Sequence, residues 1–197
     1  LTASAQATQR VRELRAAGVD IVSLTQGEPD FNTPDAIIEA ACRAMREGQT
    51  HYTPVDGTPA LKEAVAAKFR RENGLACEPA QVSVGAGGKQ VLFNALMASL
   101  DPGDEVVIPA PSWMAYADMT LFCEGLPRWV TTRPQEGFKL RPEDLERVLT
   151  PRTRWLVLNS PSNPTGAVYS AAEYRALAQV LDRHPHVGII SDEIYEH

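Results

Sequence analysis

Two short motifs carry an amide, a carboxylate and a phenol, and each follows an apolar run that is typical of a buried strand. They are Asn163-Pro164-Thr165-Gly166 and Ser191-Asp192-Glu193-Ile194-Tyr195. Directly after a buried strand, the Asp192 carboxylate is costly unless it has a partner. A protonated pyridine nitrogen is such a partner, because the two groups form a charge-assisted hydrogen bond. Asn163 and Tyr195 can donate hydrogen bonds to an oxygen on the same ring. The two motifs therefore predict a site for a protonated heteroaromatic ring.

A glycine-rich segment, residues 85–90, lies between a predicted strand and a predicted helix. This arrangement points backbone N–H groups and the positive end of a helix at an anion. The spacing does not fit a dinucleotide fingerprint, which needs glycine where Gln90 stands. It does not fit a Walker loop either, which needs glycine where Ser83 stands and Ser or Thr at position 90. We expect a phosphate-binding loop without either signature; the alternative is a tight turn that needs small residues.

An aromatic residue, Trp113, follows a third predicted strand and offers a flat face for stacking on a heteroaromatic ring. Each of these features has a plainer explanation when taken alone. Trp113 could be ordinary packing, the Asn163 segment an ordinary loop of turn-forming residues, and Asp192 a helix cap. Two X-Pro bonds and a glycine nevertheless restrict the backbone around Asn163, which indicates a side chain that must be aimed. A cis peptide before Pro164 is compatible with this.

Helix-like and strand-like segments alternate along the chain, which predicts an α/β fold with a parallel sheet covered on both faces by helices. Ligands of such sheets bind at the carboxyl ends of the strands, which is where the motif loops are expected. The expected strands are 21–24, 81–84, 105–109, 126–131, 154–158 and 187–191. The expected helices are 5–17, 34–48, 59–73, 89–100, 113–123, 142–149 and 170–183, the last opened by a Ser170/Glu173 capping box.

The composition of the 197 residues, of which 44% are hydrophobic, allows a substantial core. Nineteen basic residues against 25 acidic ones give a net charge of −6, which argues against a nucleic-acid partner. The sequence contains no apolar run of roughly 18 residues for a membrane span, and Leu1-Thr2-Ala3-Ser4 has no signal-peptide pattern. Three scattered cysteines show no metal-binding spacing. We expect no membrane partner, no metal site and a cytoplasmic location.

Six motifs, taken together and in order, resemble the class I aminotransferases of pyridoxal 5'-phosphate (PLP) fold type I, and most closely their bacterial aspartate aminotransferase branch. They are Gly27-Glu28-Pro29-Asp30-Phe31, Tyr52-Thr53, Gly87-Gly88-Lys89-Gln90, Pro111-Ser112-Trp113, Asn163-Pro164-Thr165-Gly166 and Ser191-Asp192-Glu193-Ile194-Tyr195. The resemblance implies a mainly parallel sheet sandwiched by helices, incomplete in this chain. It also implies that residues 1–34 form an N-terminal arm and part of a small domain. Residues 35–197 would be the first part of the large PLP-binding domain.

The resemblance implies that PLP would be held by residues from four of these motifs. Gly87, Gly88 and Lys89 would line its phosphate cup, and Trp113 would stack on its ring. The catalytic residues of this chain would be Asp192, which would pair with the ring nitrogen, and Tyr195. Tyr195 and Asn163 would both contact the 3'-oxygen.

The resemblance also implies substrate contacts and a homodimer. Gly27, Trp113 and Asn163 would contact the substrate, with Gly27 and Asn163 touching its α-carboxylate. Tyr52 would reach the phosphate bound in the partner subunit. The substrates would be an amino acid, aspartate or a similar one, and a 2-oxo acid.

The implied activity is transamination between that amino acid and 2-oxoglutarate, in a ping-pong cycle through pyridoxamine phosphate; prephenate is a second candidate acceptor. The family's imine-forming lysine follows the Asp192 motif. The lysines of this sequence all precede it; they are Lys62, Lys68, Lys89 and Lys139. We therefore expect these residues to be the N-terminal half of a longer enzyme and to be inactive in transamination by themselves.

Two other functions fit the same motifs. A fold-type-I PLP lyase that breaks C–S bonds or performs β-elimination would release ammonia and pyruvate from cysteine conjugates. A non-catalytic, aminotransferase-like domain that senses an effector would be marked by a DNA-binding segment upstream of it. A NAD-binding domain is disfavoured by the glycine spacing around Gln90.

Overall fold

The computed structural model describes residues 3–25 and 27–197. These residues form two compact units: the first ends at Thr53 and the second is Pro54–His197. The second unit holds a sheet and most of the helices.

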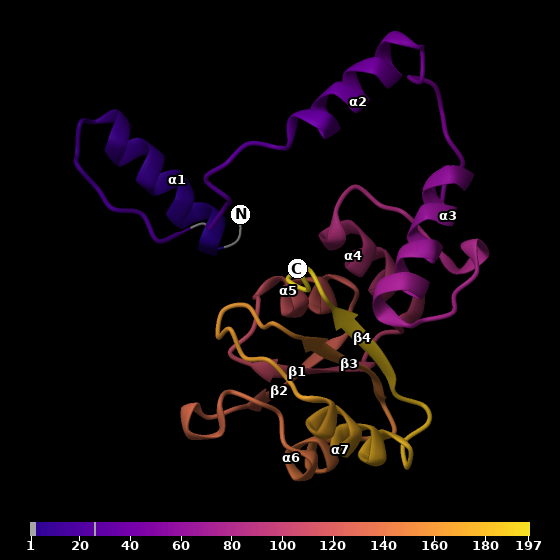
Figure 1. Cartoon of the computed structure of the whole chain (residues 1–197). Helices are drawn as coiled ribbons and strands as arrows, with labels where there is room; N and C mark the ends of the chain where they lie inside the picture. The colour runs from indigo at the N-terminus through magenta and orange to yellow at the C-terminus, as the bar shows by residue number, and fades with distance from the viewer. Residues whose placement is uncertain (1–2, 26) are drawn as a thin grey trace. The chain divides into compact units, whose positions relative to one another are not determined.

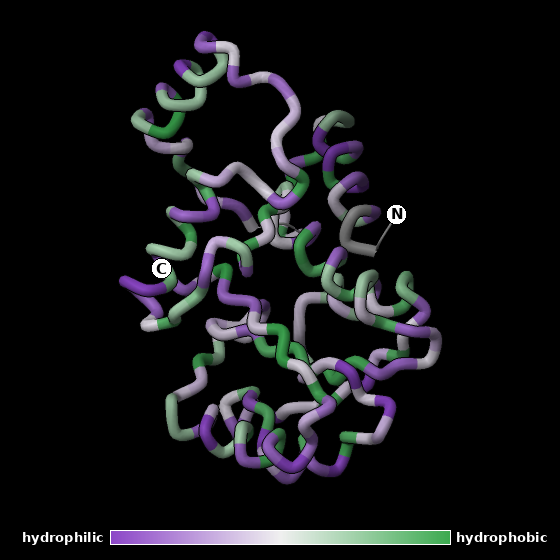
Figure 2. The backbone as a smooth tube through the Cα atoms, turned by 90° about the vertical axis from the view of Figure 1, so that its right-hand side faces the viewer, coloured by the Kyte–Doolittle hydropathy of each residue, from purple (hydrophilic) through white to green (hydrophobic). Residues whose placement is uncertain are grey.

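The first unit contains two helices, α1 (Ala3–Ala16) and α2 (Asp35–Arg46). Both predicted helices are confirmed, although α2 begins at Asp35 because Pro34 occupies the N-cap position. Figure 2 shows α1, the helix next to the N-terminal label, as mostly hydrophilic. Within the described part of the chain, no helix is long and apolar enough to cross a membrane.

The predicted strand at residues 21–24 is wrong. These residues have no regular secondary structure, and Val22 and Leu24 are 88% and 94% exposed. An isolated extended segment is unstable without a neighbouring strand to satisfy its N–H and C=O groups. The first unit offers no such neighbour among the described residues.

The second unit is built on four parallel strands in the order β2-β1-β3-β4. Their bounds are β1 Glu105–Ala110, β2 Leu126–Thr131, β3 Thr153–Asn159 and β4 Gly188–Asp192. Each coincides with a predicted strand to within one residue at either end. The parallel α/β prediction is therefore confirmed.

The predicted strand at residues 81–84 is also wrong. Pro79–Gln81 forms a short 3₁₀ helix, η2, in place of the start of that strand. The N–H of Val84 donates to the carbonyl oxygen of Asp56 at 3.0 Å, so it pairs with a loop and not with the sheet. Val82 and Val84 alternate with polar residues as in a strand, but their backbone does not pair with any of the four strands of the sheet.

Helices cover both faces of the sheet (Figure 1). The side chain of Val107 in β1 packs in a cluster with residues of α6 (Pro142–Val148) and α7 (Ala171–Leu181). Its neighbours Val106 and Ile108 pack on the opposite face, with residues of α4 (Gly88–Ser99) and α5 (Ala115–Phe122). Because side chains alternate between the faces of a strand, both faces of β1 need apolar residues.

Local signals in the sequence set several helix ends. Thr58 is the N-cap of α3 (Pro59–Lys68), and Pro59 is its first residue, in agreement with the predicted start of this helix at residue 59. A π-helical turn, η1 (Phe69–Asn73), continues α3 as far as Gly74. The capping box that opens α7 is present: Glu173 N donates to Ser170 Oγ at 3.3 Å, and Ser170 N donates to Glu173 Oε2 at 2.7 Å. A short 3₁₀ turn, η3 (Pro134–Glu136), precedes α6.

The strand order creates a topological switch point between β1 and β3. From β1 the chain passes through α5 to β2 at one edge, then crosses back through α6 to β3 on the other side of β1. At such a point the connections leave the sheet in opposite directions and open a crevice at the carboxyl ends of the two strands. The loop after β1 carries Pro111–Trp113, and the loop after β3 carries Asn163.

The opposite end of the sheet is held by a buried carboxylate, that of Glu105, which is 1% exposed. Glu105 Oε2 accepts hydrogen bonds from Thr150 Oγ1 at 2.6 Å and from Thr153 Oγ1 at 3.4 Å. Its Oε1 lies 3.5 Å from the guanidinium groups of Arg128 and Arg152. These contacts join the first residue of β1 to β2 and to the start of β3, and they compensate for burying the charge.

We expect Glu105→Ala to lower the free energy of unfolding by about 2–4 kcal/mol, because it leaves buried hydroxyl groups without their acceptor and opens a cavity. Urea unfolding of the full-length protein measures this difference. Glu63→Ala, which removes an exposed carboxylate from α3, is the matched control and should change stability little. Equal losses in the two variants would contradict a role for Glu105 in joining the strands.

Candidate functional site

The carboxylate of Asp192 is held in place at the carboxyl end of β4. Asp192 is the last residue of that strand and is in register with Asn159, the last residue of β3. Tyr116 Oη donates to Asp192 Oδ2 at 2.6 Å, and the backbone N–H of Ile194 donates to Oδ1 at 3.3 Å. The side chain is half-buried, so its orientation depends on these protein donors.

The donor to Asp192, Tyr116, is a buried phenol on α5 that is 3% exposed. Burial, together with the hydrogen bond to Asp192 and the charge of that carboxylate, raises the pKa of Tyr116 well above its usual value. The phenol therefore stays protonated and acts as a donor. Its ring packs edge-on against that of Trp113, with centroids 5.2 Å apart and an interplanar angle of 87°. The residue thus links the predicted stacking residue to the predicted charge partner.

The side-chain amide of Asn159 connects the loop after β3 to the end of β4. Its Nδ2 donates to the carbonyl oxygen of Asp192 at 2.8 Å, and its Oδ1 accepts from the backbone N–H of Asn163 at 2.7 Å. Asn163 Nδ2 in turn donates to Tyr195 Oη at 3.4 Å. The structure therefore brings Asn163, Asp192 and Tyr195 together at one edge of the sheet. Their roles toward a ligand stay predictions.

The loops after β1 and β3 contain three cis X-Pro peptide bonds, before Pro111, Pro161 and Pro164. The sequence is compatible with a cis bond before Pro164, and the structure contains one there.

The glycine loop leaves an open space in front of the amino end of α4. Gly87 has φ 92° and ψ 157°, a conformation that is essentially restricted to glycine. A Cβ atom built on Gly87 or Gly88 would meet no other atom within 4 Å. Backbone N–H groups of the first helical turn point out of a helix at this end, where an anion can accept them. The chemistry and the free space both fit a phosphate group.

The glycine loop also lies close to the aromatic part of the site. The Nζ of Lys89 is 5.1 Å from the centroid of the Trp113 ring, which is within range of a cation–π contact. Together with the Trp113–Tyr116 contact, this places the predicted phosphate loop, stacking residue and charge partner in a continuous series of contacts.

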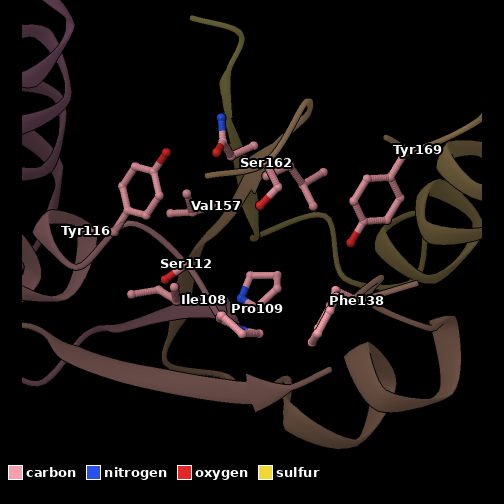
Figure 3. A pocket seen from close by; sticks show the side chains of 11 residues that line it. Ile108, Pro109, Ser112, Tyr116, Phe138, Val157, Ser162 and Tyr169 are labelled. Carbon is pink, nitrogen blue, oxygen red and sulfur yellow. The ribbon is translucent and has the colours of Figure 1, made fainter. Parts of the chain in front are cut away.

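A small cavity lies between the carboxyl ends of β1 and β3, at the switch point. Figure 3 shows Tyr116 and Tyr169 on opposite sides of this cavity, with Ser112, Val157 and Ser162 between them. Within the described residues, Ser112 Oγ is the one buried side-chain oxygen or nitrogen without a hydrogen-bond partner. The remaining lining residues are Ile108, Pro109, Pro111, Phe138, Leu158 and Asn159.

Two predicted contact residues, Gly27 and Tyr52, belong to the first unit. Both are exposed there, and neither lies in a helix or strand. Their contacts to substrate and to a partner subunit stay predictions.

Sequence reasoning missed two residues of the site, Tyr116 and Asn159. The first had a usable signal, because it lies three residues after Trp113 and a helix places such residues on one face. Asn159 is a polar residue at the end of β3, a largely buried strand, so the sequence argument that a polar group in such a place needs a partner applied to it as well.

The chain matches a known family over most of its length. Residues 19–197 match the family described as aminotransferase class I and II. An aspartate/prephenate aminotransferase from Cereibacter sphaeroides is 59% identical over 96% of this chain, which corresponds to 48% of that relative. An aspartate aminotransferase from Rhizobium meliloti is 53% identical over 95% of this chain and 46% of its own length. The chain therefore spans about half the length of the curated relatives it matches.

Solved structures agree with the sequence matches. The crystal structure of the aspartate aminotransferase from Rhizobium meliloti superposes with a TM-score of 0.95 at 51% identity, over 100% of this chain and 49% of that chain. The aspartate aminotransferase from Thermus thermophilus with maleate gives a TM-score of 0.96 at 50% identity, over 100% and 51%. These structures share the fold described above.

We expect Asn159→Ala to loosen the loop after β3, because two hydrogen bonds are lost at once. The free energy of unfolding should fall by about 1–3 kcal/mol. Amide hydrogen exchange of Asn163, whose N–H loses its acceptor, should be faster than in the unchanged protein. Asn94→Ala, which removes an exposed amide from α4, is the control. Unchanged exchange at Asn163 would show that Asn159 does not hold the loop.

Proposed function

The chain belongs to the aminotransferase class I and II family, and from this premise we propose that the full-length protein is a PLP-dependent aminotransferase. The observation that carries the proposal is the half-buried Asp192 carboxylate at the end of β4, fixed by Tyr116 beside the Asn163–Tyr195 pair. The activity is proposed for the full-length protein because the chain spans about half the length of its curated relatives.

The residues of the second unit suit PLP in three respects. The open amino end of α4 at Gly87 and Gly88, with Lys89 beside it, would hold the phosphate. Trp113 would stack on the ring. Asp192 would accept a hydrogen bond from the protonated ring nitrogen, since a carboxylate and a pyridinium form a charge-assisted pair.

The remaining polar groups would act on the ring oxygen and on the substrate. Asn163 and Tyr195, which already contact each other at 3.4 Å, would share the 3'-oxygen of the ring. Asn163 would also contact the substrate α-carboxylate, together with Gly27 and Trp113. When bound, PLP supplies an electron sink for the carbanion left by removal of the substrate's Cα proton. Asp192 would support this chemistry by keeping a proton on the ring nitrogen.

The proposed substrates are aspartate, or a similar amino acid, and 2-oxoglutarate in a ping-pong cycle. The names of the relatives support aspartate as donor and prephenate as a second candidate acceptor. Maleate, the small dicarboxylate in the Thermus thermophilus structure, supports a dicarboxylic substrate.

The proposed assembly and location follow from the family. We propose a homodimer in which Tyr52 contributes to the site of the partner subunit, and a cytoplasmic location. Residues 1–34 would belong to an N-terminal arm and a small domain, and residues 35–197 to the large PLP-binding domain.

The assay that tests the proposal uses full-length protein loaded with PLP. Conversion of aspartate and 2-oxoglutarate into oxaloacetate and glutamate is expected, with no net release of ammonia. Ammonia and pyruvate released from cysteine conjugates would point instead to the lyase. Failure to bind PLP or to transfer an amino group would contradict the proposal.

We expect Asp192→Asn to lower kcat for aspartate by about a hundredfold or more, because the ring nitrogen loses the charged partner that keeps it protonated; such a loss corresponds to about 3 kcal/mol. The KM for aspartate should change much less, since Asp192 faces the cofactor and not the substrate. Asp118→Asn removes an exposed carboxylate from α5 and is the matched control. If both variants had the kcat of the wild-type protein, Asp192 would not be the partner of the PLP ring nitrogen.

A further inference from the structure

The hydrogen bond from Tyr116 to Asp192 has a consequence for the proton shared between Asp192 and the cofactor. Resting on the proposed function, we propose that Tyr116 is a positioning residue that keeps this proton on the ring nitrogen of PLP and off the Asp192 carboxylate. Tyr116 would act through Asp192, with no contact to the substrate.

The geometry of the pair supports a fixed, strong hydrogen bond. Tyr116 Oη and Asp192 Oδ2 are 2.6 Å apart, a short distance for a phenol that donates to a carboxylate. The Tyr116 ring is 3% exposed and is held on one side by the Trp113 ring. Its backbone carbonyl accepts from Thr120 Oγ1 at 2.8 Å within α5. The phenol is therefore held in one position against Asp192.

The direction of the hydrogen bond follows from the neighbouring charges. The titratable groups that act on the phenol are Asp192 and Tyr195, and both would be negative when ionised, so both disfavour a phenolate at Tyr116. The cation of Lys89 lies against the Trp113 ring, 5.1 Å from its centroid, and is not among the groups that act on the phenol. Tyr116 consequently remains a donor throughout the range in which the enzyme would work.

A donor on Asp192 shifts the proton toward the ring. The Asp192–ring pair can exist as carboxylate and pyridinium, or as carboxylic acid and neutral pyridine. A hydrogen bond donated to the carboxylate stabilises its charged form, and therefore favours the carboxylate–pyridinium pair. The pyridinium form is the better electron acceptor, so the phenol of Tyr116 would raise reactivity without touching the reacting atoms.

The test is Tyr116→Phe in full-length protein loaded with PLP that carries ¹⁵N at its ring nitrogen. The ¹⁵N chemical shift reports whether that nitrogen is protonated. In this variant, the pH at which the nitrogen loses its proton should fall by about one unit, a tenfold change in the equilibrium. The kcat for aspartate should fall roughly tenfold, with KM nearly unchanged.

A second variant reverses the sign of the effect. Replacing Tyr116 with 3-fluorotyrosine makes the phenol more acidic and a stronger donor while keeping the ring, so the nitrogen should keep its proton to a higher pH. A residue that only fills space would not move the titration in opposite directions in the two variants. The control is Tyr174→Phe on α7, which removes a phenol that stacks on Tyr169 and should leave the ¹⁵N titration unchanged.

The outcomes separate this inference from the proposed function. Suppose that the wild-type protein binds PLP and transaminates, and that the phenylalanine and fluorotyrosine variants have the same ¹⁵N titration as the wild type. This result would overturn the role of Tyr116 and leave the proposed function standing. A lower kcat in Tyr116→Phe without a shifted titration would overturn it too. Should Tyr116→Phe fail to fold, the fluorotyrosine variant decides: a shift to higher pH supports the role, and no shift overturns it. Failure of the wild-type protein to bind PLP would contradict the proposed function itself.

Discussion

A partly buried carboxylate at the end of an edge strand needs partners that fix its orientation, and much of the site can be understood as the supply of those partners to Asp192. The phenol of Tyr116 comes from α5, and the backbone N–H of Ile194 comes from the turn that follows β4. The amide of Asn159 fixes the carbonyl group of Asp192 from the neighbouring strand. Partial burial makes each contact matter more than it would in water, because a charge that has lost some of its hydration is stabilised by protein donors.

The two ends of the same sheet use buried carboxylates in different ways. At the amino end, Glu105 has two hydroxyl donors and two guanidinium groups nearby, and it joins three strands. At the carboxyl end, Asp192 is only half-buried and lies at the end of β4, beside the end of β3. A carboxylate that is fully surrounded by protein donors stabilises the fold, whereas one that stays partly exposed can also bind a cationic ring. This division agrees with the usual location of ligands in parallel α/β sheets.

Sequence patterns succeeded where a local cause was sufficient and failed where a partner was required. The capping box of Ser170 and Glu173, and the Thr58-Pro59 helix start, are recognisable because their contacts lie within a few residues. The residues at 81–84 have the alternation of a strand, but Val84 pairs with the loop carbonyl of Asp56. Periodicity describes which residues prefer to be buried; it does not say which backbone will pair with them.

By itself the sequence determined the α/β class, four of the six expected strands, the order of the six motifs and the membership of the family that these motifs indicated. The sequence predicted that Asn163, Asp192 and Tyr195 act at one site, and the tertiary structure decided how they are held there, with Tyr116 and Asn159 as their partners. The reason is physical. Hydrogen bonds such as Tyr116–Asp192 connect residues 76 positions apart, and they exist only after the parallel register of β3 and β4 and the docking of α5 have brought the groups together. Helical spacing could have placed Tyr116 near Trp113, but a pairing between residues so far apart in the chain leaves no periodic signal, so the hydrogen bond to Asp192 is seen only in the folded arrangement.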